Sequence, residues 1–126
     1  MLDLIGRPYR FGADGTDPDG ALDCIHLVYL VLQRLRIPHP AFDPAWYTAP
    51  PRDVLSALSR WGTRIELPQY DGDVVLLPHT NYAFGVTWED GILYTAEHLY
   101  AVNWQPLRVW RPRRSYRCAS FPTSAN

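Results

Sequence analysis

Cys24 is the residue of this chain best suited to nucleophilic chemistry. It follows Asp23 and lies near the start of the apolar stretch 20–37. A thiolate can attack a carbonyl carbon, and the N-terminus of a helix favours the thiolate over the thiol. A cysteine is also a common core residue, so both a nucleophilic and a packing role remain open. The stretch is predicted to form a helix with one apolar face, because its apolar side chains recur at helical spacing: Cys24, Leu27, Val28, Val31 and Leu35.

A cysteine nucleophile needs a base, usually a histidine, which takes the thiol proton and later protonates the leaving amine. His26 lies about 200° around a helix axis from Cys24, so we expect it to pack or to be solvated on the far side. His79 and His98 occur in the second half of the chain and are the two histidines that could swing toward Cys24. His39 lies between two prolines and is predicted to be surface loop.

The sequence predicts neither a cofactor nor a metal. The four histidines are scattered, and no pair of histidines or cysteines has ligand spacing. There is no glycine loop of the type that holds phosphate. Residues 12–20 are rich in Asp, but they lack the ligand spacing and terminal Glu of a calcium loop, so a solvated loop is predicted.

The composition is that of a globular protein. The chain has 126 residues, 47% of them hydrophobic and 20% charged, which fits one domain. No apolar run is long enough to predict a membrane span. The first ten residues lack the layout of a secretory signal, so we expect a product made in the cytoplasm without a signal peptide, or one carried out as part of something larger. Two cysteines cannot form a dense disulfide framework, and reduced thiols are expected.

The charge is unevenly distributed along the chain. All twelve basic residues are Arg; five lie in residues 104–126, which hold no acid, whereas the remainder has seven Arg against thirteen acids. Such an end could contact phosphate. The interpretation that we prefer is docking on the acidic body or on a partner protein, without nucleic acid.

The element pattern changes from helices to strands along the chain, which predicts an α+β fold. The Pro-rich residues 37–51 are expected to form a surface excursion without regular structure. Residues 2–6 are predicted to be the end of an N-terminal helix, and two further helices are predicted at 22–36 and 52–62. The strands of an antiparallel meander are predicted at 63–68, 72–78, 82–96, 99–104 and 107–112. The segment 82–96 is predicted to be two strands joined by a hairpin turn at 89–91.

The order of these parts resembles NlpC-type cysteine peptidases, papain-like enzymes that cut the stem peptides of bacterial peptidoglycan. The resemblance rests on "PYRFG", "DC" at a helix start, "GDVVLL" and "FGVTWEDGILYTA", and covers roughly residues 4 to 117. The ending "VWRPRRSYR" is similar to the phage-tail branch of that family. The resemblance implies a papain-like NlpC-type fold, with N-terminal helices packed on an antiparallel sheet. The chain is expected to form a single domain over 1–126, with an Arg-rich C-terminal segment from about 104.

Carried over residue by residue, the resemblance implies Cys24 as nucleophile and Tyr9 as the tyrosine shortly upstream. The histidine position of the family holds Ala83, and the third polar position holds Thr95. The "SG" that usually follows "DC" is replaced by Ile25 and His26. The nucleophile is therefore kept, whereas the base is not.

The resemblance thus implies a cell-wall-peptidase-like domain of a phage or phage-like tail tip, located in the virion tail. Loss of the histidine favours a catalytically degenerate, structural or binding domain, whose partners are other tail or baseplate proteins. The alternative is an active peptidoglycan endopeptidase that acts on stem peptides through Cys24, with His79 or His98 as substitute base. A thiol-dependent transferase is a third interpretation, since fold does not fix function.

Overall fold

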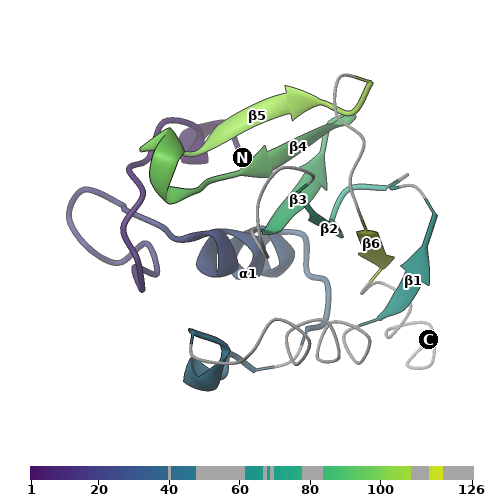
Figure 1. Cartoon of the computed structure of the whole chain (residues 1–126), viewed down its shortest axis with the longest axis horizontal. Helices are drawn as coiled ribbons and strands as arrows, with labels where there is room; N and C mark the ends of the chain where they lie inside the picture. Colours follow the sequence, from purple (N-terminus) through teal and green to yellow (C-terminus); the bar gives the residue numbers. More distant parts are fainter. Residues whose placement is uncertain are drawn as a thin grey trace.

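The computed structural model describes residues 1–39, 41–47, 62–66, 68, 70–77, 84–108 and 114–117 (Figure 1). These residues form one α-helix, six strands and three short 3-10 helices. In chain order they are η1 (Leu2–Leu4), α1 (Cys24–Arg34), η2 (Pro44–Tyr47), β1 (Thr63–Ile65), β2 (Asp73–Leu76), β3 (Phe84–Trp88), β4 (Gly91–Tyr94), η3 (Glu97–Leu99), β5 (Asn103–Pro106) and β6 (Arg114–Arg117). The predicted α+β class is confirmed, with one helix on an antiparallel sheet. The helix predicted over 52–62 lies outside the described residues, apart from Gly62.

The sheet is antiparallel and has the strand order β1-β6-β2-β3-β4-β5. Strands β2 to β5 form the predicted meander, and the β3–β4 turn lies at Glu89 and Asp90 as expected. The strand predicted over 107–112 is a turn at its first two residues, and the rest of it lies outside the described residues. The strand β6 follows at 114–117 and pairs with β2 and β1, not with β5. Leu107 lies in a turn, and its backbone N–H donates to the Asp90 carbonyl. The chain leaves the sheet edge at this turn.

The helix α1 begins and ends where local chemistry requires. Asp23 is its N-cap, and its side chain accepts a hydrogen bond from the backbone N–H of His26. Arg36 has a φ of 58°, a left-handed conformation in which a helix cannot continue. The helix is therefore shorter at both ends than the predicted 22–36.

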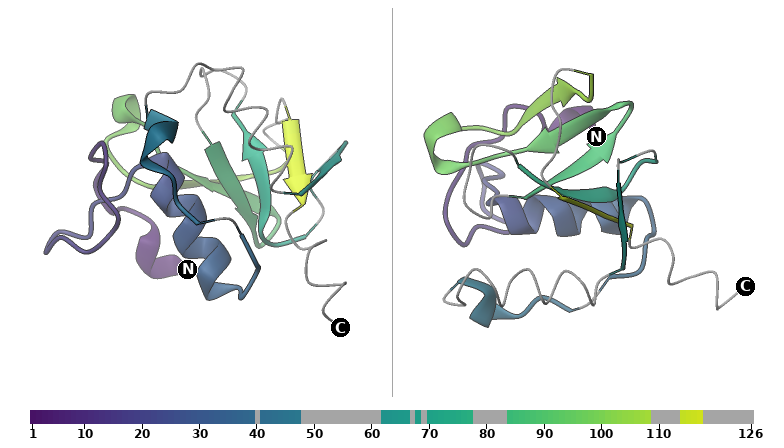
Figure 2. Two further views of the ribbon diagram at one scale, coloured as in Figure 1. Left: turned by 90° about the horizontal axis from the view of Figure 1, so that it is seen from below. Right: turned by 45° about the vertical axis from the view of Figure 1, so that its right-hand side comes forward.

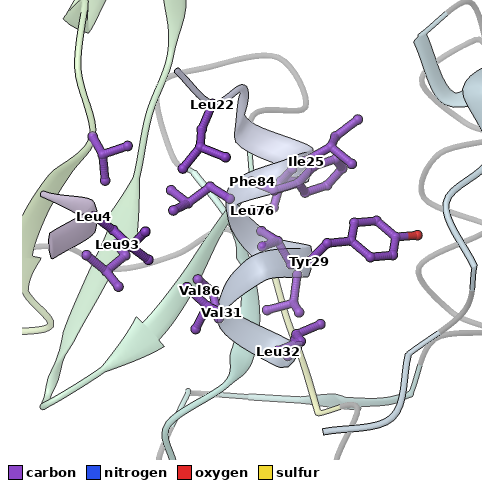
Figure 3. Packing of buried hydrophobic residues seen from close by; sticks show 14 of the residues in the cluster. Leu4, Leu22, Ile25, Tyr29, Val31, Leu32, Leu76, Phe84, Val86 and Leu93 are labelled. Atoms are coloured by element: carbon purple, nitrogen blue, oxygen red, sulfur yellow. The ribbon is translucent and has the colours of Figure 1, made fainter. Parts of the chain in front are cut away.

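The main core lies between α1 and one face of the sheet (Figure 3). Because side chains alternate along strands, neighbouring residues of β2 and β4 serve opposite faces. The second face carries a smaller cluster of Val75, Leu77, Ile92 and Tyr94. The main cluster includes Leu27, Val28, Val31 and Leu32 of α1 and Val74, Leu76, Phe84, Val86 and Leu93 of the sheet.

The Pro-rich stretch is not the purely superficial excursion that was predicted. Residues 44–47 form η2, and Phe42 and Tyr47 pack against the main core cluster. This segment lies on the side of α1 opposite the sheet (Figure 2). Proline suits the first position of a helical turn, and burial of the two aromatic rings fixes the segment in place.

The carboxylates of the Asp-rich loop before α1 form hydrogen bonds and ion pairs with neighbouring residues of the same segment. Arg10 forms ion pairs with Asp17 and Asp19, and the Thr16 hydroxyl donates to Asp14. Within the described ranges no group of three or more His, Cys, Asp or Glu side chains is arranged to hold a metal ion. None of the helices in those ranges is long and apolar enough to span a membrane.

Candidate active site around Cys24

Cys24 lies in the first turn of α1, as predicted, and is the first residue of the helix; it is partly buried against the main core. Burial raises the pKa of its thiol to about 11, and the neighbouring Asp23 carboxylate adds to the increase. Backbone hydrogen bonds from Phe84, Cys24 and Ile25 act in the opposite direction. The helix N-terminus therefore does not offset the cost of desolvation, and the thiol is protonated at neutral pH.

The start of β3 lies directly against this thiol. The backbone hydrogen bond to Cys24 comes from Phe84, the first residue of β3. Ala83 itself lies outside the described residues, but it directly precedes Phe84 in the chain. Its methyl side chain carries no proton that could be exchanged with the thiol.

Thr95 follows β4 at the same end of the sheet. Gly85 of β3 pairs with Tyr94 of β4, so Phe84 and Thr95 both lie just beyond that pair. The Thr95 side chain is fully buried, and its hydroxyl has no hydrogen-bond partner in the part of the chain that the structure describes. A buried hydroxyl without a partner is costly, and this one is at the position that the resemblance assigned to the third polar residue.

Tyr9 is held beside the first turn of α1 by backbone pairing. It bridges to Leu22, and its N–H donates to the Tyr100 carbonyl. Burial raises the pKa of the Tyr9 phenol, with further increases from Cys24, Asp23 and Glu97. The Tyr9 phenol thus interacts electrostatically with Cys24 and Asp23, and its role at this site stays a prediction.

Asp23 is a buried carboxylate that accepts four hydrogen bonds from three segments. Its Oδ1 accepts from the backbone N–H of His26 at 2.8 Å and faces the His26 Nδ1 at 2.9 Å. Its Oδ2 accepts from the Gly12 N–H at 3.0 Å and from the Tyr47 hydroxyl. Because all its acceptor positions are used, the carboxylate joins the loop, the helix and η2.

His26 packs between aromatic rings instead of extending into solvent. Its ring centroid is 4.5 Å from that of Phe42 and 6.4 Å from that of Tyr47. The Tyr47 hydroxyl lies 3.1 Å from His26 Nδ1. Since Nδ1 faces the Asp23 carboxylate, we assign the ring proton to this nitrogen.

The other histidines remain untested or differ from expectation. His79 lies outside the described residues, and so does the side chain of His98, whose backbone is in η3. His39, predicted to be loop surface, is half-buried, with its ring 4.8 Å from that of Tyr29.

Tyr47 is the residue at this site that sequence reasoning missed. It occurs in the Pro-rich stretch, more than twenty residues after Asp23, and no local pattern connects the two. The available signal was the aromatic pair at 46–47 in a segment otherwise expected to be exposed. Aromatic residues in such a segment indicate that part of it packs on the body of the protein.

Two solved structures are similar to this chain over most of its length. One is NlpC2 from Trichomonas vaginalis, with a TM-score of 0.62 and 16% identity over 92% of this chain and 43% of that one. The other is the NlpC/p60 domain of the peptidoglycan hydrolase SagA, with a TM-score of 0.55 and 18% identity over 92% of this chain and 91% of that one. The chain thus spans less than half the length of NlpC2.

No protein-family model and no curated protein matches the sequence. The structural matches stand on the arrangement of elements, since identities this low do not establish shared chemistry. They confirm the expected fold, in which a core helix packs on an antiparallel sheet. In this chain that helix begins at Cys24. The chain therefore has an NlpC/p60-like α+β fold.

Proposed function

We propose that this chain is a cell-wall-peptidase-like domain of the NlpC/p60 type that has lost peptidase activity and serves as a structural or binding part of a phage or phage-like tail tip. The observation that carries the loss of activity is the backbone of Phe84 bonded to the Cys24 thiol, because the residue that precedes Phe84 in the chain is Ala83 and not a histidine.

The chemistry disfavours hydrolysis at two steps. With a pKa of about 11, roughly one thiol in ten thousand is ionised at pH 7. A histidine at position 83 would favour the thiolate and would protonate the leaving amine, and alanine does neither. Loss of one member of a catalytic unit typically lowers the rate by orders of magnitude.

The tail location rests on the sequence resemblance, and its partners would be other tail or baseplate proteins. The Arg-rich segment from about 104 is the proposed contact. Within it, Arg108 is exposed, whereas Trp104 is used by the fold itself, because its indole N–H donates to the Trp88 carbonyl at 2.9 Å. Immunogold labelling of purified tail particles from the source strain tests this location, and particles without label would contradict it.

Activity is tested by incubating the purified chain with peptidoglycan and measuring released peptide fragments by mass spectrometry. We expect no release above that of the Cys24→Ala variant, with an active NlpC/p60 hydrolase as positive control. Release by the parent that the Cys24→Ala variant lacks would overturn the proposal.

The second candidate is an active peptidoglycan endopeptidase with a relocated base. The observation that favours it is the imidazole–carboxylate pair of His26 and Asp23, in the same helical turn as the thiol. Helix geometry places the side chains of Cys24 and His26 on diverging sides, which is why we rank this candidate second. If fragments are released, single alanine replacements of His26, His79 and His98 will identify the base.

A further inference from the structure

Residues 41–47, here called the strap, cross the side of α1 that faces away from the sheet. Figures 1 and 2 show α1 between the sheet and this segment. The backbone of the strap is largely superficial, since Ala41, Asp43, Pro44 and Ala45 are exposed. Among its described side chains, those of Phe42 and Tyr47 are half-buried and pack against the main core cluster.

Phe42 seats the strap on the outer side of α1. Its ring centroid lies 4.5 Å from that of His26 and 5.9 Å from that of Tyr29. Figure 3 shows Tyr29 directed away from the sheet, toward this side. The Phe42 ring also lies 5.6 Å from that of Tyr47, so the strap's two aromatic rings pack together.

Tyr47 seats the other end of the strap at the first turn of α1. Its hydroxyl donates to the Asp23 carboxylate, and its ring lies 4.7 Å from that of Phe11. Asp23 directly precedes Cys24, so this contact lies beside the nucleophile position. Burial and Asp23 raise the pKa of the Tyr47 phenol, and Cys24 contributes to the same increase, which agrees with a short distance between them.

We propose that the strap is a lid over the first turn of α1, latched by the hydrogen bond between Tyr47 and Asp23, and that opening this latch controls access to the Cys24 thiol. A surface segment with an exposed backbone, anchored through side chains such as those of Phe42 and Tyr47, can open locally without unfolding of the core. The lid rests on the proposed function for its meaning, because both concern the Cys24 site. Its test reads chemical access instead of hydrolysis, so either proposal can fail alone.

The test compares alkylation of Cys24 by a small and a bulky reagent, iodoacetamide and N-(1-pyrenyl)maleimide. All variants carry Cys118→Ser, which leaves Cys24 as the one thiol of the sequence. Both reagents react with the thiolate, so the ratio of the two rates cancels any change in the pKa of Cys24 and reports access. In Tyr47→Phe we expect this ratio to rise at least about fivefold, because the variant removes the latch and keeps the ring.

The matched control is Tyr100→Phe, which removes a hydroxyl from a side chain that is 80% exposed. Its ratio should stay within about twofold of the parent. The variant Tyr47→Ala, which also removes the ring contacts with Phe11 and Phe42, should raise the ratio further. A ratio in Tyr47→Phe that stays within about twofold of the parent would overturn the proposal, even if Tyr47→Ala raises it, because the latch is the hydrogen bond.

Amide hydrogen exchange distinguishes a lid from a general loss of stability. In Tyr47→Phe, exchange should become faster in peptides from residues 41–47 and stay unchanged in the second half of α1, at residues 30–34. Equal acceleration in both regions would mean that the hydroxyl supports the whole fold, and this result would also overturn the lid.

Discussion

The two sides of α1 are held by different kinds of contact. Toward the sheet the helix presents Leu27 and Val31, which are fully buried among aliphatic side chains. Away from the sheet it presents His26 and Tyr29, which contact the aromatic rings of the strap. The first side relies on close packing, whereas the second combines ring contacts with a hydrogen-bonded carboxylate.

This difference suggests how the molecule separates stability from access. Aliphatic packing is intolerant of gaps, so the sheet side fixes the position of the helix and of Cys24. Hydrogen bonds at the outer side contribute less net free energy, since water can replace them when the strap opens.

The largest effect is expected on the sheet side. Leu27→Ala should lower the free energy of unfolding by about 3 kcal/mol, because it leaves a cavity in a fully buried site. Urea denaturation followed by circular dichroism measures this loss. The control is Gln33→Ala, an exposed position of the same helix, with an expected change within about 0.5 kcal/mol. Similar losses in both variants would contradict the contrast.

A smaller effect is expected at the carboxylate that joins the two sides. Asp23→Ala removes the helix cap and leaves the donors of Gly12, His26 and Tyr47 without their acceptor. We expect a loss of about 2 kcal/mol in the same denaturation assay. Asp23→Asn keeps a capping oxygen and should lose less. If the asparagine variant is as unstable as the alanine variant, the negative charge matters more than the cap.

The third prediction concerns the thiol at the boundary of the two sides. Ala83→His should lower the pKa of Cys24 from about 11, because an imidazolium beside a thiolate favours the charged form. The rate of alkylation by iodoacetamide at pH 7.5 should rise at least about tenfold, the change that one pKa unit produces. Ala83→Asn, polar but uncharged, is the control. Equal rates in the two variants would show that position 83 does not act on the thiol.

The same raised pKa predicts how stability depends on alkaline pH. Between the ordinary thiol pKa and about 11, the unfolded chain loses the Cys24 proton and the folded chain keeps it. Stability should therefore fall as the pH rises through this window, and Cys24→Ala should remove that part of the decrease. Parallel pH profiles of the parent and the variant would contradict the burial of the thiol.

The smallest effect is expected at the far end of α1, where Arg34 contacts the exposed Asp3 at 2.6 Å. The hydrogen bond from Arg34 holds the pKa of Asp3 below its usual range. A carboxylate with a lowered pKa contributes stability above the ordinary value, and this contribution is lost as the pH falls below about 4. Asp3→Asn should cost about 0.5 kcal/mol at pH 7, since exposed pairs are screened by water. A difference that persists unchanged at pH 2 would argue against the ion pair as its cause.

The residues by themselves determined the local elements of this protein. The spacing of Cys24, Leu27 and Val31 is sufficient to predict a helix with Cys24 in its first turn, although the predicted bounds of 22–36 are too wide at both ends. The turn at Glu89 and Asp90 is sufficient to predict the β3–β4 hairpin. These features depend on contacts between residues close in sequence, so a linear pattern contains the information.

Only the tertiary structure decided the long-range contacts. The pairing of β6 with β2 joins residues about forty positions apart, and no pattern in residues 114–117 predicts which strand they pair with. The Tyr47 hydroxyl meets Asp23 across more than twenty residues of loop and helix, and the raised pKa of Cys24 results from burial beneath other segments. Burial and pairing of this kind follow from the packing of the whole chain. The energy of each contact depends on segments far away in the sequence, so the residues around one partner do not predict the other.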